Sequence, residues 1–129
     1  MKKYKFIVEK TNTGFSAYSA DFEEYPAATT GSTITEIKAN ALEALNLLFD
    51  YDGKKQIAAE QIVIQLDIPQ FFEYYKVINA KAFSERVGIN TQLLNQYIKG
   101  SKVPSDKQVG KIASGLSEVG KELMELDYA

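Results

Sequence analysis

The sequence predicts an α+β protein: a small antiparallel sheet with one packed helix, followed by an all-α domain of about five helices. Three observations predict this class. Stretches rich in β-formers alternate with turn residues over the first thirty positions. A long amphipathic pattern follows at 35–49, and from residue 68 onward apolar residues recur at helical spacing. The predicted domains are therefore residues 1–67, α+β, and residues 68–129, all helical.

Four segments of the first domain have strand character. Lys3 to Thr11 and Phe15 to Phe22 are rich in β-formers and flank the turn residues Asn12 to Gly14, which predicts an antiparallel hairpin. Ala27 to Thr30 is expected to form a short third strand. The apolar run IVIQL at 62–66 predicts a fourth.

The helix expected at 35–49 has the clearest pattern in this domain. Its apolar stripe consists of Ile37, Ala41, Ala44, Leu45 and Leu48. Thr33 or Ser32 can cap its amino terminus. Glu36 has capping-box spacing from Thr33, and its charge suits the helix dipole. The order strand, strand, strand, helix, strand predicts one helix packed on a small sheet.

Helical patterns continue through the second domain. Pro69 suits the first turn of a helix that extends over 70–78. Six apolar side chains crowd this helix: Phe71, Phe72, Tyr74, Tyr75, Val77 and Ile78. Two further helices are expected at 105–115 and 117–126. The last is acidic, and we interpret it as a closing or dimerising helix.

Between these, residues 79–99 predict two short helices joined by a tight turn. Gly88 marks the end of the first helix, because glycine adopts the left-handed conformation at least cost. Asn90 or Thr91 can cap the second helix. Ser84 is small and falls where the two helices would approach closely.

The second of these helices, roughly Thr91 to Lys99, has two different faces. Its apolar stripe is Leu93, Leu94, Tyr97 and Ile98. The other side carries Thr91, Gln92, Asn95, Gln96 and Lys99. A solvated face would usually carry Glu and Lys, whereas Asn and Gln can pair with an adenine edge in the major groove. The predicted base contacts are Gln92, Asn95 and Gln96, with Asn90 and Thr91 at the helix start. The predicted phosphate contacts are Lys99, Ser101 and Lys102.

The distribution of charge agrees with this prediction. The net charge is −2, but residues 79–111 carry six Lys and Arg against two Asp and Glu, a net +4. A basic footprint is expected where a protein binds DNA. Residues 1–78 carry eight cations against eleven anions, which suits a basic protein partner.

Composition excludes several kinds of site. The chain has no Cys, so it has no disulfide, thiolate metal site or cysteine nucleophile. It has no His, the commonest metal ligand and general base. No catalytic residue, metal or cofactor is predicted. No apolar run is long enough for a membrane span, and the basic start has no secretory pattern, so we expect a cytoplasmic protein.

Residues 88–105 resemble the recognition-helix segment of the Cro/repressor, or XRE-type, helix-turn-helix family. The positions in register are Gly88, Ile89, Asn90, Asn95, Gly100, Pro104 and Ser105. The chain departs from the family at Ile98 and Lys99, where Glu-Asn is frequent. The resemblance implies binding to double-stranded operator DNA, which we expect of a homodimer or higher oligomer. The plainer alternative is a small helical bundle that binds no DNA.

Residues 31–46, GSTITEIKANALEALN, resemble a segment of HicB-type antitoxins. The matching positions are Gly31, Thr33, Glu36, Asn40, Ala41, Ala44 and Leu45. Those proteins pack a helix on a partial ribonuclease-H-like sheet, and many add a DNA-binding module. The stretch 21–26 lacks the glycine of the Pro-Asp-Leu-Pro-Gly segment often found there. The resemblance implies a type II antitoxin that occludes a HicA-like mRNA interferase, a small basic ribonuclease, and represses its own operon.

Two other functions are alternatives to this one. A stand-alone XRE-type regulator would sense a small molecule in a pocket lined by Phe15, Tyr18, Phe22 and Tyr25. A nuclease would hold metal through Asp21, Glu23, Glu24 and Glu36. Metal catalysis needs carboxylates that converge from separate strands, and Glu23 and Glu24 are adjacent in an expected loop, so this function is not favoured.

Overall fold

The structure is a computed structural model that describes residues 1–128. The chain divides into two compact units, a first unit from Met1 to Phe71 and a second unit that begins at Phe72. Helix α2, Ile68–Tyr74, extends across this division. The division therefore lies four residues after the boundary placed at 67/68 from the sequence.

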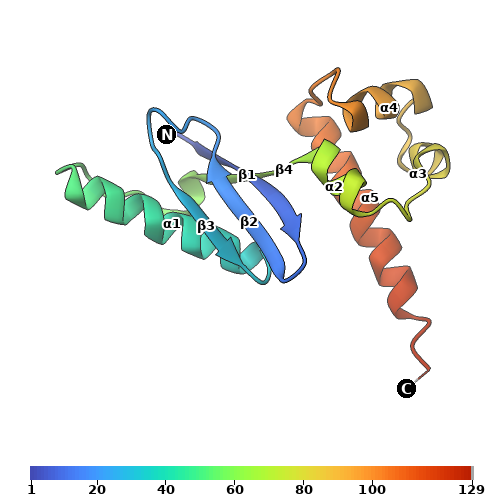
Figure 1. The fold of residues 1–129 in the computed structure, drawn as a ribbon, viewed down its shortest axis with the longest axis horizontal. Coiled ribbons are helices and arrows are strands. Elements are labelled where there is room, and N and C mark those ends of the chain that lie inside the picture. Colours follow the sequence, from blue (N-terminus) through green and yellow to red (C-terminus); the bar gives the residue numbers. More distant parts are fainter. Residues whose placement is uncertain (129) are drawn as a thin grey trace. The chain divides into compact units, whose positions relative to one another are not determined.

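The first unit is a four-stranded sheet with one long helix, as predicted. Its elements are β1 (Tyr4–Thr11), β2 (Gly14–Ser19), β3 (Ala28–Gly31), α1 (Ile34–Tyr51) and β4 (Ile62–Leu66). A single 3-10 turn, Ala59–Gln61, precedes β4. The strands lie in the order β3-β2-β1-β4, and α1 runs along one face of the sheet (Figure 1).

The sheet is mixed, so the prediction of an antiparallel sheet is wrong for its last strand. β1 pairs antiparallel with β2, and β2 with β3. β4 instead pairs parallel with β1, from Tyr4 opposite Ile62 to Val8 opposite Leu66. The reason lies in the connection, because α1 returns the chain along the sheet before β4 begins. A strand that follows such a crossover helix runs parallel to the strand before it.

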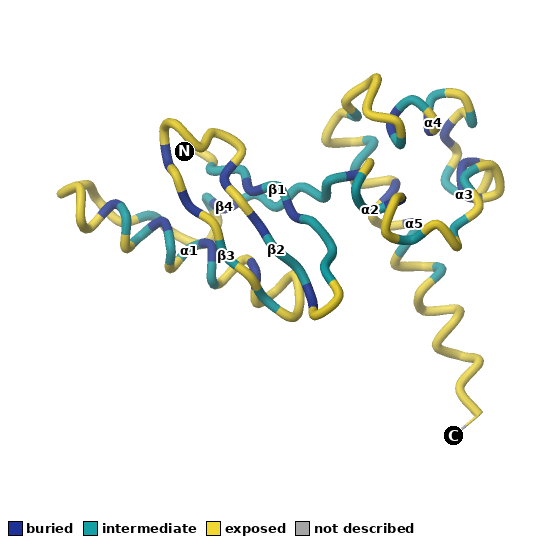
Figure 2. The backbone as a smooth tube through the Cα atoms, viewed as in Figure 1, coloured by how far each residue is buried: buried dark blue, intermediate teal, exposed yellow. Residues whose placement is uncertain are grey.

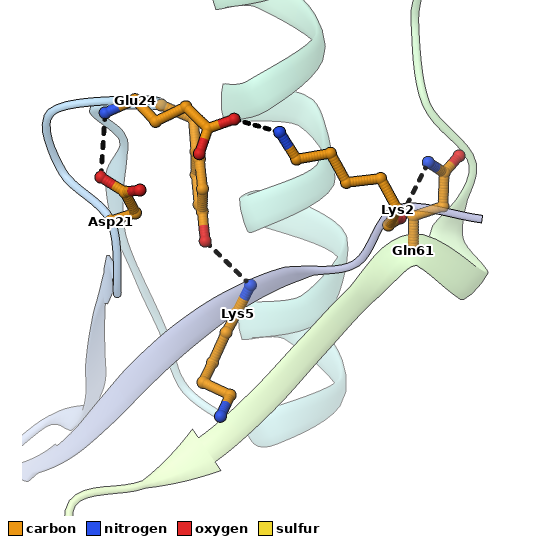
Figure 3. Close-up of polar contacts among 6 residues, drawn as sticks. Lys2, Lys5, Asp21, Glu24 and Gln61 are labelled. Atoms are coloured by element: carbon orange, nitrogen blue, oxygen red, sulfur yellow. Dashed lines mark hydrogen bonds and ion pairs between the residues drawn. The ribbon is translucent and has the colours of Figure 1, made fainter.

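Strand β2 ends at Ser19, earlier than the predicted end at Phe22. Asp21 turns the chain here. Its Oδ1 accepts a hydrogen bond from Glu24 N at 3.0 Å (Figure 3). Its carbonyl oxygen accepts another from Tyr25 N at 3.0 Å. An Asp side chain that binds a neighbouring backbone amide in this way competes with the strand ladder.

The loop between β2 and β3 is fastened to the start of the chain. Glu24 forms an ion pair with Lys2, and this hydrogen bond raises the pKa of Lys2 (Figure 3). The Lys5 amide donates to the Tyr25 hydroxyl at 3.3 Å. Gln61 Nε2 donates to the Lys2 carbonyl at 3.1 Å, which joins the chain start to the turn before β4. These contacts hold the loop in place, although its residues form no strand pairing with the sheet.

The core of the first unit lies between α1 and the sheet. Its buried side chains are Phe6, Val8, Ala17, Tyr25, Ala27, Ile37, Ala41, Leu45, Phe49 and Ile62. The predicted stripe of α1 is confirmed at three positions, while Ala44 and Leu48 are only partly buried and Phe49 completes the buried face. The predicted cap is also confirmed, since Thr33 Oγ1 accepts from Glu36 N at 3.1 Å.

Over residues 68–128, the chain forms four helices rather than the five expected. They are α2, α3 (Ala80–Val87), α4 (Thr91–Lys99) and α5 (Asp106–Met124). α2 ends at Tyr74, four residues before the predicted end at Ile78. The two helices predicted over 105–126 are one helix, α5. Gly115, where the first of them was expected to end, lies inside this helix.

Gly115 instead lies buried against α3. A Cβ atom at this position would be 2.2 Å from Val87 Cγ1 and 3.2 Å from Phe83 Cζ. The glycine therefore allows α3 and α5 to approach closely. The buried apolar side chains of this unit are Phe72, Phe83, Ile89, Leu94, Tyr97 and Ile112.

Candidate nucleic-acid interface

The connection between α3 and α4 takes only three residues, and each has a defined conformational role. Gly88 adopts the left-handed conformation at φ 71° and ends α3, as predicted. Ile89 is buried, and its amide donates to the Ser84 carbonyl at 3.0 Å. Asn90 caps α4, because its Oδ1 accepts from the amides of Gln92 at 2.9 Å and Leu93 at 3.3 Å. The orientation of α4 relative to α3 is fixed by this turn.

Ser84 lies where α3 and α4 meet, as its size predicts. Its side chain is fully buried. Ser84 Oγ donates to the Lys81 carbonyl at 2.7 Å and lies 2.7 Å from Thr91 Oγ1. The two hydroxyls form a hydrogen bond between the helices, so Thr91 also takes part in their packing.

Helix α4 presents an amide-rich face opposite its buried face. Residues 92, 95, 96 and 99 fall within an arc of about 100° at about 100° per residue, and the centres of Leu94 and Tyr97 lie opposite. Leu94 and Tyr97 are buried, and Leu93 and Ile98 are partly buried. Gln92, Asn95 and Lys99 are exposed, whereas Gln96 is partly buried. Three of the predicted DNA contacts are therefore open to solvent on one side of the helix.

The other two predicted base contacts, Asn90 and Thr91, have side-chain oxygens that already bind within the protein. The Asn90 oxygen caps α4, and the Thr91 hydroxyl pairs with Ser84. The Asn90 side chain is exposed, and its amide nitrogen is not used by the cap. These two residues thus build the start of α4 in addition to any contact with a ligand.

Replacing Asn90 with alanine should lower the stability of the second unit by about 1 kcal/mol, because two amides of α4 lose their acceptor. Asn90→Asp should keep the stability, since aspartate caps equally well. Urea denaturation of the full chain, with hydrogen exchange read on peptides from α4, measures both variants. An alanine variant as stable as the original chain would contradict the capping role.

The loop after α4 brings the predicted phosphate contacts together. Gly100 is left-handed at φ 80° and ends the helix. The carbonyl of Gln96 accepts from the amides of Ser101 at 3.0 Å and Lys102 at 3.3 Å. Lys99, Ser101 and Lys102 are all exposed. The three side chains therefore follow the amide face directly at the carboxyl end of α4.

Positive charge around α3 and α4 is exposed as well. The exposed cations are Lys81, Arg86, Lys99, Lys102, Lys107 and Lys111. Arg86 forms an ion pair with Glu122 of α5. Within residues 1–128, no ion pair engages Lys99 or Lys102. Their charges remain free to interact with an anionic ligand.

The side chains proposed for a small-molecule pocket do not form one. Phe22 is 57% exposed and Tyr18 is also exposed. Phe15 packs against the core. Tyr25 borders a cavity of about 90 Å³ together with Tyr4 and Phe49. Pockets for drug-sized ligands usually measure about 300–1,000 Å³, so this cavity is small for such a ligand.

The four carboxylates considered for metal binding do not assemble a site either. Asp21 binds the backbone of its own loop, and Glu24 pairs with Lys2. Glu36 lies in the first turn of α1, outside that loop. Among residues 1–128, no three acidic side chains are grouped closely enough to hold a metal ion. Over the same residues, no helix is sufficiently long and apolar to cross a membrane.

Neither a scan against models of protein families nor a search of curated proteins gives a match for this chain.

Proposed function

We propose that this chain is a DNA-binding antitoxin of a type II toxin–antitoxin pair. Its second unit binds operator DNA through α3 and α4, in the manner of the XRE-type helix-turn-helix that it resembles. Its first unit, which resembles HicB-type antitoxins, occludes a small basic mRNA interferase similar to HicA. The observation that carries the proposal is the exposed face of Gln92, Asn95 and Lys99 on α4.

Amide side chains on an exposed helix favour recognition of bases over simple solvation. Asn and Gln present a donor and an acceptor side by side, which matches the N6 and N7 positions of adenine. Lys99 at the end of α4 and Lys102 in the loop after it would then contact the phosphates that flank the groove. The short α3–α4 connection supplies the compact shape that lets one helix enter the major groove.

A dimer follows from the length of α4. Its nine residues extend only about 13 Å, so one copy reads few base pairs. A homodimer would read two half-sites about 34 Å apart. The end of α5 and the residues after it offer exposed apolar surface for this purpose, with Leu123 59% and Met124 78% exposed in the helix and Leu126 65% exposed beyond it. We therefore assign dimerisation to the carboxyl-terminal part of α5.

The antitoxin role rests on the first unit. It carries seven Lys against ten Asp and Glu over residues 1–71, so an anionic surface is available for a basic ribonuclease. The chain has no His, so an interferase that uses histidine as its catalytic base is a separate protein. Inhibition is by occlusion, in which this unit covers the basic RNA-binding surface of the toxin.

Affinity capture of the tagged full chain from its own host, followed by intact-mass analysis, tests the antitoxin role. We expect one stoichiometric, small, basic protein. Ribonuclease activity should return when the complex is denatured and this partner is refolded alone. A chain that elutes as a DNA-binding homodimer without a partner would refute the antitoxin role and leave the DNA-binding role in place.

Lys99→Ala should weaken binding to all DNA sequences alike and reduce the slope of log affinity against log salt concentration by about 1. The reason is that a phosphate contact releases counterions but reads no base. Titration of the promoter DNA upstream of the gene at several salt concentrations measures the slope. Lys38→Ala, a change at an exposed lysine of the first unit, is the control and should leave the slope unchanged.

A further inference from the structure

Helix α1 carries a second surface, on the side that faces away from the sheet. Its buried residues Ile37, Ala41 and Leu45 follow one stripe, and exposed residues alternate with them along the helix (Figure 2). Glu36, Glu43 and Asp50 recur every seven residues and are all exposed. At about 100° per residue, they lie opposite the centre of the buried stripe.

Two large apolar side chains lie on or beside this row of carboxylates. Leu47 is 65% exposed and is placed between Glu43 and Asp50. Tyr51, one turn further along, is 89% exposed. We call Glu36, Glu43, Leu47, Asp50 and Tyr51 the outer acidic face. The face is held rigid by a capped helix of 18 residues, so little order would be lost when it binds.

We propose that the outer acidic face binds a basic amphipathic helix of a protein partner. Successive carboxylates are about 10.5 Å apart along the axis, too far to share one cation. None of the three has an ion-pair partner within residues 1–128. A partner helix with Lys or Arg at seven-residue spacing would pair with these carboxylates, and apolar residues between its cations would pack on Leu47 and Tyr51.

The charge of the face also decides against a symmetric contact with the same face of a second copy. Two identical acidic faces would place like charges together across the interface, which is unfavourable. The exposed tyrosine favours a protein partner, because Tyr is among the residues that most often dominate binding energy. The inference rests on the proposed function in one respect, namely that the partner is the small basic mRNA interferase that the first unit occludes.

Photocrosslinking in the host tests the location of the interface. The full chain carries p-benzoylphenylalanine at position 47, and a matched chain carries it at Phe22, an exposed aromatic in the β2–β3 loop of the same unit. We expect position 47 to give at least about fivefold more adduct with one basic protein than position 22. The adduct should map to a helical segment with Lys or Arg seven residues apart.

Binding of that purified protein then tests the chemistry. Tyr51→Ala and Glu43→Lys should each weaken the affinity about tenfold, since one loses an anchor and the other a charge pair. Both side chains are exposed, so neither change removes core packing. Glu60→Lys, at an exposed residue of the same unit outside this face, should leave the affinity within about twofold.

Three results would overturn the inference. An adduct from position 22 but not from position 47 would reject this face and leave the antitoxin role standing. No adduct from either position would also reject this face, whereas the antitoxin role is decided separately by the affinity capture of a basic partner. Unchanged affinity for both Tyr51→Ala and Glu43→Lys would show that the captured protein binds elsewhere.

Discussion

Replacing Gly115 with leucine is expected to destabilise the second unit by about 3 kcal/mol, near the upper end for overpacking. The Cβ alone would lie 2.2 Å from Val87 Cγ1. Real Cβ atoms do not approach so closely, and Val87 is a branched side chain beside the turn at Gly88. The clash must therefore push α3 away from α5 or distort the start of the α3–α4 turn.

The same helix supplies a matched control. Gly120 lies in α5 as well, and a Cβ there would meet nothing within 4 Å. Gly120→Leu should stabilise the protein by about 0.5–1 kcal/mol, because leucine favours a helix over glycine. Urea denaturation measures both variants, with hydrogen exchange on α3 to localise the change. Equal effects of the two substitutions would contradict the close packing of α3 on α5.

Gly115 also explains why the helices after residue 105 were predicted incorrectly. A glycine within a helical pattern can either end a helix or allow a neighbouring element to approach. The two cases look alike in a sequence, since they differ only in whether another helix packs against the glycine. The turn at Gly88 was predictable because its causes are local, namely a left-handed glycine followed two residues later by a capping Asn90.

The sheet shows the same contrast between local and distant causes. The order of strands and helix in the first unit can be predicted from features within each segment, namely the β-formers and turn residues of the strands and the stripe and cap of the helix. The α1 crossover sets the direction of β4, but the neighbour with which β4 pairs is β1, whose residues are more than fifty positions away. The early end of β2 depends on the side chain of Asp21, which accepts a hydrogen bond from the Glu24 amide, and the strand pattern does not reveal this contact.

At the candidate interface, periodicity alone separates the two faces of α4, because burial in a helix follows its 3.6-residue repeat. Periodicity does not indicate which polar side chains are already bound. Thr91 and Gln92 are both polar and both lie outside the apolar stripe of α4. The Thr91 hydroxyl nevertheless forms a hydrogen bond with buried Ser84 on the preceding helix. Periodicity likewise predicts no role for Leu47 of α1, because this exposed residue lies outside the buried stripe of that helix.

Replacing both Gln92 and Asn95 with alanine is expected to remove sequence discrimination while keeping non-specific binding. Each paired amide contact contributes about 1–3 kcal/mol of discrimination, so operator affinity should fall at least about 30-fold. Affinity for random DNA should fall less than about threefold, because phosphate contacts remain at Lys99 and Lys102. Competition between promoter DNA and random DNA of equal length, at fixed salt concentration, measures the ratio.

Unfolding would not account for such a loss. Both residues are exposed, and alanine has a higher helix propensity than either, so the melting temperature should be unchanged or slightly higher. Gln56→Ala, at an exposed amide of the first unit, is the control and should leave both affinities unchanged. Equal losses on promoter and random DNA would mean that the amide face contacts the backbone rather than bases. An unchanged ratio with unchanged affinities would place the DNA-binding surface elsewhere, because the amide face of α4 is what distinguishes this helix from a merely solvated one.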